Sequence, residues 1–323
     1  MLAVYAEKAS FDDPLSTLRV GERPEPKARE GWVRVKISHA SLNRHDLFTL
    51  RGISGHPEGI KFPMILGNDG AGVLDDGTSV VIYPVMGDAD WRDDETLDPH
   101  WHIPSEFEQG TFADYVVVPR RNAVPIPEGL SPLHASVLTT AWLTAFRALF
   151  TRSGLRAGQT LLVQGASGGM STALIQLGRA AGFEVWVTTR NEQGREIADK
   201  LGAHRVFAAN EKLPRKVHAV VDSIGPASWD HTMDSIAQGG TIVITGVTTG
   251  FEAKLPLIPM LTQQITIAGS IMGTMQDLKD MMGFVVRSRI VPEIGTVVPM
   301  EEAMGAFRAM WEGTTRGKAV FTR

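Results

Sequence analysis

The chain has 323 residues, of which 43% are hydrophobic and 21% charged, as expected for a globular protein long enough for two domains. Its formal net charge of -4 is spread along the sequence, and no lysine and arginine cluster predicts binding to nucleic acid or to an anionic membrane. Cysteine is absent, which excludes disulfides, thiolate zinc sites, iron–sulfur clusters and a cysteine nucleophile.

The N-terminal segment carries early acidic residues and no long apolar core, so we expect no signal peptide and a cytoplasmic protein. Two uncharged stretches, residues 129–146 and 255–276, are interrupted by prolines and polar side chains. Both are therefore predicted to be buried elements of a soluble fold, not membrane spans.

The first part of the chain reads as β-rich. Residues 32–38 alternate between apolar and polar side chains, residues 71–85 contain two apolar runs around an Asp-Asp-Gly turn, and residues 112–119 form a further apolar run. No helix of any length is expected before Ser131. Residues 84–109 form a long acidic loop, which is predicted to be solvated and not metal-binding because its Asp and His spacing matches no regular ligand pattern.

The sequence pattern changes near residues 121–127, which are predicted to be a linker. A helix begins with Ser131 as N-cap and Pro132 at its first position. Strands and helices then alternate, and a further helix over 275–286 and a strand over 319–322 close the chain. The alternating strands are expected at 160–164, 184–189, 205–208, 218–224, 241–247 and 265–269. This order predicts an α/β fold whose second half is a doubly wound parallel sheet of six strands, the Rossmann arrangement.

A glycine-rich turn follows the first of these strands, in the segment LLVQGASGGMS over residues 161–171. Glycines let the backbone approach a pyrophosphate, and the following helix presents free N–H groups to it. The third glycine of the usual fingerprint is replaced by Ser171, which is also small. The expected cofactor contacts in the turn are Gly165, Ala166, Ser167, Gly168, Gly169 and Met170.

The same turn also matches the nucleophile elbow of serine hydrolases, with Ser167 between Gly165 and Gly169. That activity needs an acid and then a histidine after the serine, and no histidine follows His231. A serine hydrolase is therefore kept as a remote alternative, with Asp222 and His231 as the available pair.

The tip of the second strand of this sheet indicates which nicotinamide cofactor binds. NAD-binding folds place an acid there to hold the ribose 2′-hydroxyl, and this chain has Thr189 and Arg190 instead, followed by Arg195. Guanidinium and hydroxyl groups suit a 2′-phosphate, so NADP(H) is the predicted cofactor.

With these segments placed, the chain resembles the medium-chain dehydrogenase/reductase superfamily, and most of all its zinc-independent, quinone-oxidoreductase-like branch. The matching segments cover residues 40–52, 62–74, 110–119, 141–149, 163–182, 220–225, 239–250, 265–274 and 317–321. The resemblance implies a GroES-like catalytic domain over 1–122 and 271–323, a Rossmann NADP-binding domain over 123–270, an active site in the cleft, and a homodimer joined through strand 265–269. It further implies cofactor contacts at Thr144, Gly246 and Val247.

Zinc-using relatives would place their catalytic ligands at Asn43, Asn68 and Thr140, none of which is a good zinc ligand. The resemblance puts His45 where those relatives carry a proton-relay hydroxyl and Asp69 where they carry an acid beside the metal. Asn43 and His45 are therefore the predicted catalytic residues, and no zinc is expected.

The expected reaction is hydride transfer from NADPH to an electrophilic small molecule, a quinone or an α,β-unsaturated carbonyl. Alcohol or aldehyde dehydrogenase activity and a non-catalytic NADPH sensor remain as alternatives.

Overall fold

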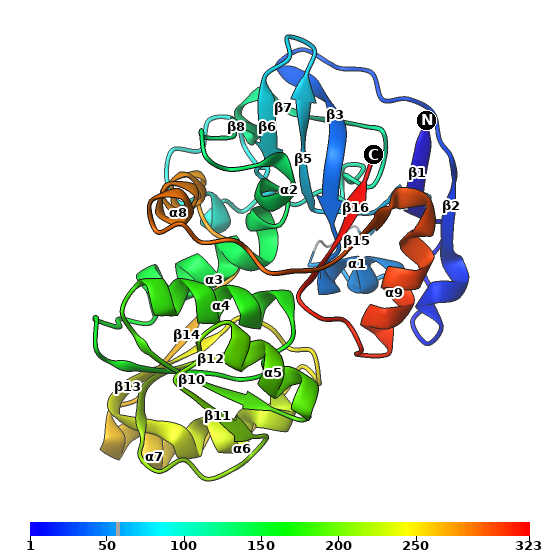
Figure 1. Ribbon diagram of the computed structural model, residues 1–323. Coiled ribbons are helices and arrows are strands. Elements are labelled where there is room, and N and C mark those ends of the chain that lie inside the picture. The colour runs from blue at the N-terminus through cyan, green and yellow to red at the C-terminus, as the bar shows by residue number, and fades with distance from the viewer. Residues whose placement is uncertain (56–58) are drawn as a thin grey trace. The chain divides into compact units, whose positions relative to one another are not determined.

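The structure is a computed structural model that describes residues 1–55 and 59–323 (Figure 1). Contacts divide the chain into two compact units. Unit 1 comprises Met1–Ala141, Gly273–Arg287 and Val291–Arg323, and unit 2 comprises Trp142–Met272 and Ser288–Ile290. None of the helices within residues 1–55 and 59–323 has the length and hydropathy of a membrane span.

Unit 1 is built on a mostly antiparallel sheet, as the alternating sequence pattern predicts. Its strand order is β15-β16-β3-β5-β6-β8, with β7 also paired to β3. These strands are β3 (Trp32–Ser41), β5 (Asp69–Leu74), β6 (Ser79–Ile82), β7 (Tyr115–Pro119), β8 (Ala123–Pro125), β15 (Ile294–Pro299) and β16 (Lys318–Thr322). A smaller sheet contains β1 (Leu2–Ala6), β2 (Leu18–Glu22) and β4 (Met64–Ile65). Along β3, Val33, Val35 and Ile37 alternate into the core, which is the period-two pattern of a half-buried strand.

The C-terminal strand completes this sheet. In Figure 1 the red strand β16 lies beside the blue strand β3, and Val320 pairs with Ser41 in an antiparallel register. Phe321 packs edge-on against Phe112, with ring centroids 4.9 Å apart. Residues from opposite ends of the sequence therefore share one core, and the pairing carries Lys318 to the end of β3.

Residues 123–141 also pack with unit 1, although the linker pattern placed the domain boundary before residue 123. Strand β8 pairs with β6, and helix α2 (Pro132–Ala135) contacts strands β3, β5 and β6. Ser131 caps α2 by accepting a hydrogen bond from the His134 N–H, as its sequence predicts. The helical path continues through a π-helical turn (Leu138–Trp142), α3 (Leu143–Arg147) and a second π-helical turn (Ala148–Arg152).

The expectation of no helix before Ser131 is wrong, because α1 (Arg44–Leu50) follows β3 directly. Seven residues are too few for a helical repeat to stand out in the sequence, and tertiary contacts, not propensity, hold such a short helix. Helix α9 (Ala303–Trp311) was not predicted either, and it covers the same core through the buried Phe307.

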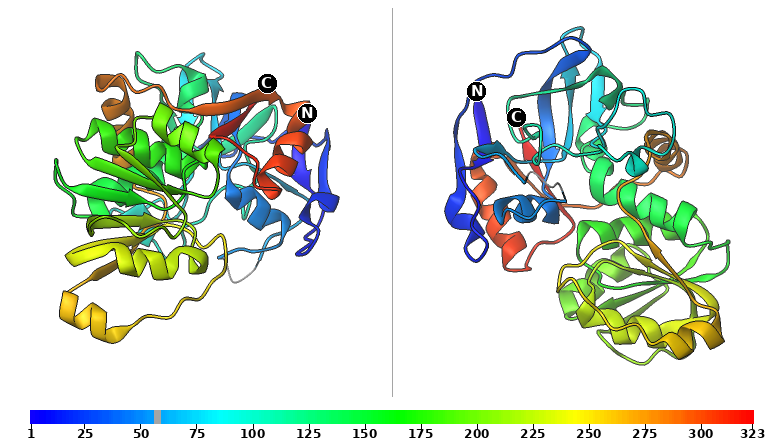
Figure 2. Two further views of the ribbon diagram at one scale, coloured as in Figure 1. Left: turned by 60° about the horizontal axis from the view of Figure 1, so that its bottom comes forward. Right: turned by 180° about the vertical axis from the view of Figure 1, so that it is seen from behind.

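Unit 2 is the predicted Rossmann fold. Its six strands follow the order β11-β10-β9-β12-β13-β14, and all their pairings are parallel. Figures 1 and 2 show α4 and α5 on one face of this sheet and α6 on the other. The strands are β9 (Thr160–Val163), β10 (Glu184–Thr189), β11 (Arg205–Ala208), β12 (Val217–Asp222), β13 (Ile236–Ile244) and β14 (Thr266–Gly269). The remaining helices are α4 (Gly169–Ala180), α5 (Glu192–Lys200), α6 (Pro226–Ser235) and α7 (Leu257–Gln263), with α8 (Met275–Arg287) in unit 1.

Residues 255–276 are not a buried segment throughout, which corrects the sequence-based expectation. Helix α7 has no buried residue, and Leu257, Ile258 and Leu261 are 71%, 75% and 78% exposed. The helix precedes β14, the edge strand of the sheet. A segment without charges is expected to be buried, but its sequence does not show which surface covers it. In the single chain, α7 remains exposed.

Candidate functional site

A buried lysine forms the centre of a polar cluster in unit 1, where β3, β5 and β16 meet. Lys318 Nζ lies 2.9 Å from the carbonyl oxygen of Leu42, 2.6 Å from Asn43 Oδ1 and 2.9 Å from Asp69 Oδ2. The side chains of Lys318 and Asp69 are only 2% and 0% exposed. An ammonium has three donors, so these acceptors satisfy the lysine completely.

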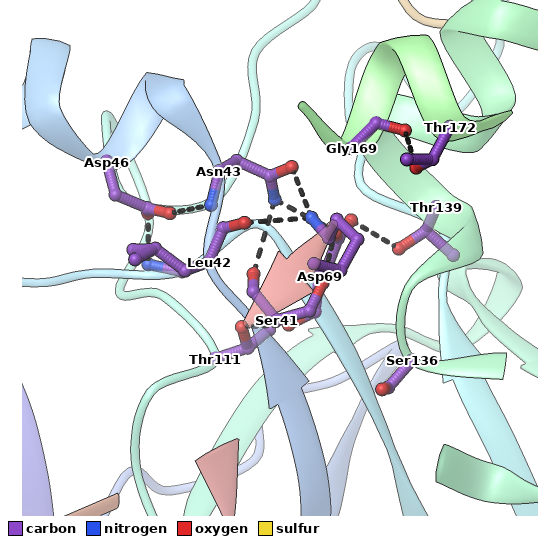
Figure 3. Close-up of polar contacts among 12 residues, drawn as sticks. Ser41, Leu42, Asn43, Asp46, Asp69, Thr111, Ser136, Thr139, Gly169 and Thr172 are labelled. Atoms are coloured by element: carbon purple, nitrogen blue, oxygen red, sulfur yellow. Dashed lines mark hydrogen bonds and ion pairs between the residues drawn. The ribbon is translucent and has the colours of Figure 1, made fainter. Parts of the chain in front are cut away.

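Asp69 gathers hydrogen bonds from several elements at once (Figure 3). Its Oδ2 accepts from Ser41 Oγ at 2.6 Å and Asn43 Nδ2 at 2.9 Å, and its Oδ1 accepts from Thr139 Oγ1 at 2.8 Å. Burial alone would raise the pKa of this carboxyl. The Lys318 ammonium, with the hydrogen bonds from its neighbours, instead holds the pKa of Asp69 below its usual value.

Asn43 is fixed by its neighbours at the start of α1. Its backbone N–H donates to Asp46 Oδ2 at 2.8 Å, and its amide Nδ2 also donates to the Ser41 carbonyl at 3.3 Å. Asp46 accepts a second backbone bond from Gly67 at 2.9 Å, and its burial raises its pKa to about 6. The amide of Asn43, one of the two predicted catalytic residues, therefore donates to Asp69 and Ser41.

His45, the other predicted catalytic residue, pairs with a carboxylate that the sequence did not single out. Its Nε2 lies 2.6 Å from Glu106 Oε1, and these side chains are 22% and 11% exposed. The neighbouring residues hold Asn68, whose Nδ2 donates to the Pro104 carbonyl at 2.5 Å and to Ser105 Oγ at 3.0 Å. The end of the acidic loop thus packs against the site through residues 104–106.

Asp98 and Asp94, earlier in this loop, accept hydrogen bonds from the backbone of the loop itself. Asp98 accepts from the N–H groups of Asp88 and His100, at 2.6 and 2.8 Å, and Asp94 accepts from the N–H of Thr96 at 2.9 Å. Among the residues that the structure describes, no group of three His, Cys, Asp or Glu side chains is arranged to hold a metal ion.

The predicted phosphate-binding turn lies between β9 and α4 in unit 2. Gly165 has a φ of +88°, a conformation that favours glycine, and Gly168 precedes the helix in extended conformation. The Gly165 N–H donates to Thr188 Oγ1 at 3.1 Å, which ties the turn to β10. The first N–H groups of α4 follow from Gly169 and Met170 onward, so this helix terminus has the geometry that binds an anion.

The expected cofactor residues outside the turn follow other strands of the same sheet. Thr189 ends β10, with Arg190 next to it, while Gly246 and Val247 follow β13. Because all strands are parallel, their carboxyl ends share one edge of the sheet with the turn. Thr144 lies in α3 and is 8% exposed.

Two arginines were predicted to read a 2′-phosphate, and the structure distinguishes them. Arg190 is exposed, whereas the Arg195 guanidinium donates to the Val206 carbonyl at 3.1 Å. Gly194 lets α5 approach β10 closely, because a Cβ there would lie 2.0 Å from Thr189 Oγ1. Because Arg190 is exposed and the Arg195 guanidinium already has a partner, Arg190 is the better candidate for binding the 2′-phosphate.

The residues of the hydrolase alternative have other partners. His231 Nδ1 lies 2.9 Å from Gln164 Nε2 and its Nε2 lies 2.8 Å from the Glu211 carbonyl oxygen. Asp222 accepts from Ser228 at 2.8 Å and from Thr232 at 2.7 Å. Both ring nitrogens and the carboxylate are committed to the fold, so this set does not form a catalytic relay with Ser167.

Sequence reasoning missed Lys318 and Glu106. Lys318 had one signal, since it lies inside the segment GKAVF, where its neighbours Ala319, Val320 and Phe321 are all buried. A charge in such a run requires a partner. Glu106 had no comparable signal, because it is one of many acids in its loop.

Comparisons with known proteins place both units in one family. A family model described as the alcohol dehydrogenase GroES-like domain matches residues 29–128, and one described as zinc-binding dehydrogenase matches residues 169–287. An alcohol dehydrogenase of Geobacillus stearothermophilus is 26% identical, with 94% of this chain and 95% of that protein aligned. An acryloyl-coenzyme A reductase of Sulfurisphaera tokodaii is 26% identical, with 95% and 97% aligned. A crystal structure of an NAD-dependent alcohol dehydrogenase matches with a TM-score of 0.91 and 29% identity, over 100% of both chains.

We predict that Lys318→Met lowers the free energy of unfolding by about 3–5 kcal/mol, because it leaves the Asp69 carboxylate buried without its cation. Equilibrium urea denaturation measures this loss. Lys36→Met, at an exposed position of β3, is the matched control and should change stability by less than about 0.5 kcal/mol. A loss for Lys318→Met no larger than that of the control would show that the pair does not stabilise the fold.

Proposed function

Since this chain belongs to the medium-chain dehydrogenase/reductase superfamily, we propose that it transfers hydride from NADPH to an α,β-unsaturated carbonyl compound or a quinone, without zinc. Membership of the family makes it an oxidoreductase. The observation that supports a zinc-free reaction with a conjugated acceptor is the position of the Lys318 ammonium, 2.6 Å from Asn43 Oδ1 and 2.9 Å from Asp69 Oδ2.

The residues present do not fit a zinc ion. Asn43, Asn68 and Thr140, the positions of the ligands in zinc-using relatives, offer amide and hydroxyl groups, whereas zinc prefers thiolate, imidazole and carboxylate. The Asn43 oxygen already accepts a hydrogen bond from the buried Lys318 ammonium. The reaction that we propose therefore involves no metal ion.

A conjugated acceptor suits a site without a Lewis acid. Hydride addition to a simple aldehyde builds full charge on one oxygen, which a metal stabilises by several kcal/mol in the relatives that hold one. Addition to an enone or quinone spreads that charge into an enolate or hydroquinone anion. His45 then provides the proton that completes the reduction. The name of the Sulfurisphaera tokodaii relative, acryloyl-coenzyme A reductase, also describes a conjugated substrate.

The residues of unit 2 fit a nicotinamide dinucleotide, which supplies the hydride when bound. The Gly165–Met170 turn and the start of α4 would hold its pyrophosphate, and Arg190 its 2′-phosphate. NADH is the alternative, because a solved structure similar to this chain is described as NAD-dependent.

Two other functions are the alternatives to this proposal. Alcohol or aldehyde dehydrogenase activity is favoured by the name of the Geobacillus stearothermophilus relative. A non-catalytic NADPH sensor would use the Rossmann unit alone. Screening NADPH oxidation against quinones, enones and saturated aldehydes separates the three, because tight NADPH binding without turnover would favour the sensor.

We also propose a homodimer that forms through β14 and α7. The strand lies at the sheet edge, where unpaired backbone groups accept another strand. Next to it in sequence, Leu257, Ile258 and Leu261 are more than two-thirds exposed, at 71%, 75% and 78%. A cluster of apolar side chains of this kind is typical of a protein interface.

The zinc-free mechanism predicts the metal content and the substrate preference together. Metal analysis should find no stoichiometric zinc in the purified enzyme, and a chelator should leave turnover unchanged. The value of kcat/KM should be higher for quinones or enones than for saturated aldehydes. An enzyme that loses activity with chelator and works fastest on simple alcohols or aldehydes would contradict the mechanism.

Arg190→Ala should weaken NADPH binding by roughly 10- to 100-fold, because one charge-assisted contact with the 2′-phosphate is lost. NADH affinity should change little, since NADH lacks this phosphate. Titration of both cofactors by fluorescence measures the effect, and Arg156→Ala, at another exposed arginine of unit 2, is the control. Equal losses for the two cofactors would mean that Arg190 does not recognise the phosphate.

Ile258→Asp should convert the dimer into a monomer, because it buries a carboxylate in the apolar interface that we propose. Light scattering after size-exclusion chromatography reports the mass. Leu97→Asp, at an exposed leucine in unit 1 (61% exposed), should leave the dimer intact. A wild-type monomer, or a dimer that persists in Ile258→Asp, would reject this interface.

A further inference from the structure

His45 and Asn68 are held by three consecutive residues of the acidic loop. Pro104 and Ser105 accept hydrogen bonds from the Asn68 amide, and Glu106 lies 2.6 Å from His45 Nε2. Ser105 is fully buried and has a φ of +67°, in the left-handed region. Such a conformation persists only where surrounding contacts determine it, so this segment is fixed in place against the site.

The second oxygen of Glu106 is also engaged. Ser54 Oγ donates to Glu106 Oε2 at 3.2 Å, while Oε1 faces His45. The Glu106 side chain is 11% exposed. The hydrogen bond from Ser54 holds one carboxylate oxygen, so that the other faces the imidazole of His45. A carboxylate is acceptor-only when ionised, so the imidazole must present an N–H to it.

This contact determines which ring nitrogen of His45 remains available for another partner. With Nε2–H donated to Glu106, the remaining atom is Nδ1. Within residues 1–55 and 59–323, His45 Nδ1 and Asn68 Oδ1 are buried polar atoms without a hydrogen-bond partner. Buried polar atoms are almost always paired in folded proteins, so orphaned atoms beside a proposed site mark groups that a ligand or water completes.

We propose that Glu106 is a positioning residue for proton transfer, which fixes the Nε2–H tautomer of His45 and leaves Nδ1 to exchange the proton with substrate. The inference rests on the proposed function, in which His45 completes the reduction. The substrate double bond gains the hydride that NADPH supplies at one carbon and the proton from Nδ1 of the imidazolium at the other. The Nδ1–H bond breaks, the neutral imidazole keeps its Nε2–H on Glu106, and the ring regains a proton from water.

The test compares Glu106→Gln with Glu108→Gln. Glutamine preserves the size of Glu106, but its amide can either accept from or donate to Nε2, so the tautomer is no longer fixed. Glu108, two residues away, pairs at 2.6 Å with the exposed Arg29 and is the matched control. NADPH affinity and thermal stability show whether each variant is folded.

The first measurement needs no turnover. Nitrogen-15 spectra of histidine-labelled protein, assigned with His45→Asn, should show His45 protonated at Nε2 in the wild type and in Glu108→Gln. Glu106→Gln should show a mixture of tautomers. A wild-type His45 protonated at Nδ1 alone, or a spectrum unchanged in Glu106→Gln, overturns the proposal whether or not the enzyme reduces enones.

The second measurement is steady-state reduction of the best acceptor found in the screen. Glu106→Gln should lower kcat by roughly 10- to 100-fold, within the range that acid–base catalysis supplies, with the KM for NADPH unchanged. The solvent deuterium isotope effect on kcat should rise, because proton transfer becomes slower. A kcat within about twofold of the wild type, alongside a shifted tautomer, would overturn the catalytic role of the pair. Failure of the wild type to reduce any acceptor rejects the proposed function instead, and the spectra still decide whether Glu106 fixes the tautomer.

Discussion

The structure of unit 1 depends on one buried ion pair, Lys318 with Asp69. Two charges taken out of water cost several kcal/mol each, and only close geometry with full hydrogen bonding offsets that cost. The donors of Lys318 are all used, and Asp69 accepts from three further side chains. Because Lys318 lies on β16 and Asp69 on β5, the pair also links the C-terminal strand to a strand from the first part of the chain.

The pair shapes the chemistry of the site. It places a positive charge, balanced by a carboxylate, beside Asn43, where the sequence resemblance to zinc-using relatives implies a metal ligand. An ammonium with all three donors occupied can orient neighbours, but it does not polarise a substrate oxygen as an open metal site does. In the mechanism that we propose, such a site suits an acceptor that disperses its own charge, with His45 transferring the proton and Glu106 orienting His45.

Much of the fold could be predicted from the sequence, because regular patterns of apolar residues and turn residues indicate its strands and helices. The apolar runs ending at Val163 and Thr189, with the glycine-rich turn between them, identified the Rossmann sheet, and Ser131 marked a helix start. Helix α1 was missed since seven residues show no repeat. Glu106 and Lys318 could not be assigned because their partners, His45 and Asp69, lie 61 and 249 residues away along the chain. Only the folded sheet brings these side chains together, and no local pattern records such a contact.

The reaction that we propose is a zinc-free hydride transfer to a conjugated acceptor. Reduction of an enone by metal-depleted protein with NADPH that carries two deuterium atoms at C4 of its nicotinamide tests this reaction. The product should carry one deuterium at its β-carbon and one solvent hydrogen at its α-carbon. A product without deuterium from the cofactor, or deuterium transfer that appears only after zinc is added back, would contradict it.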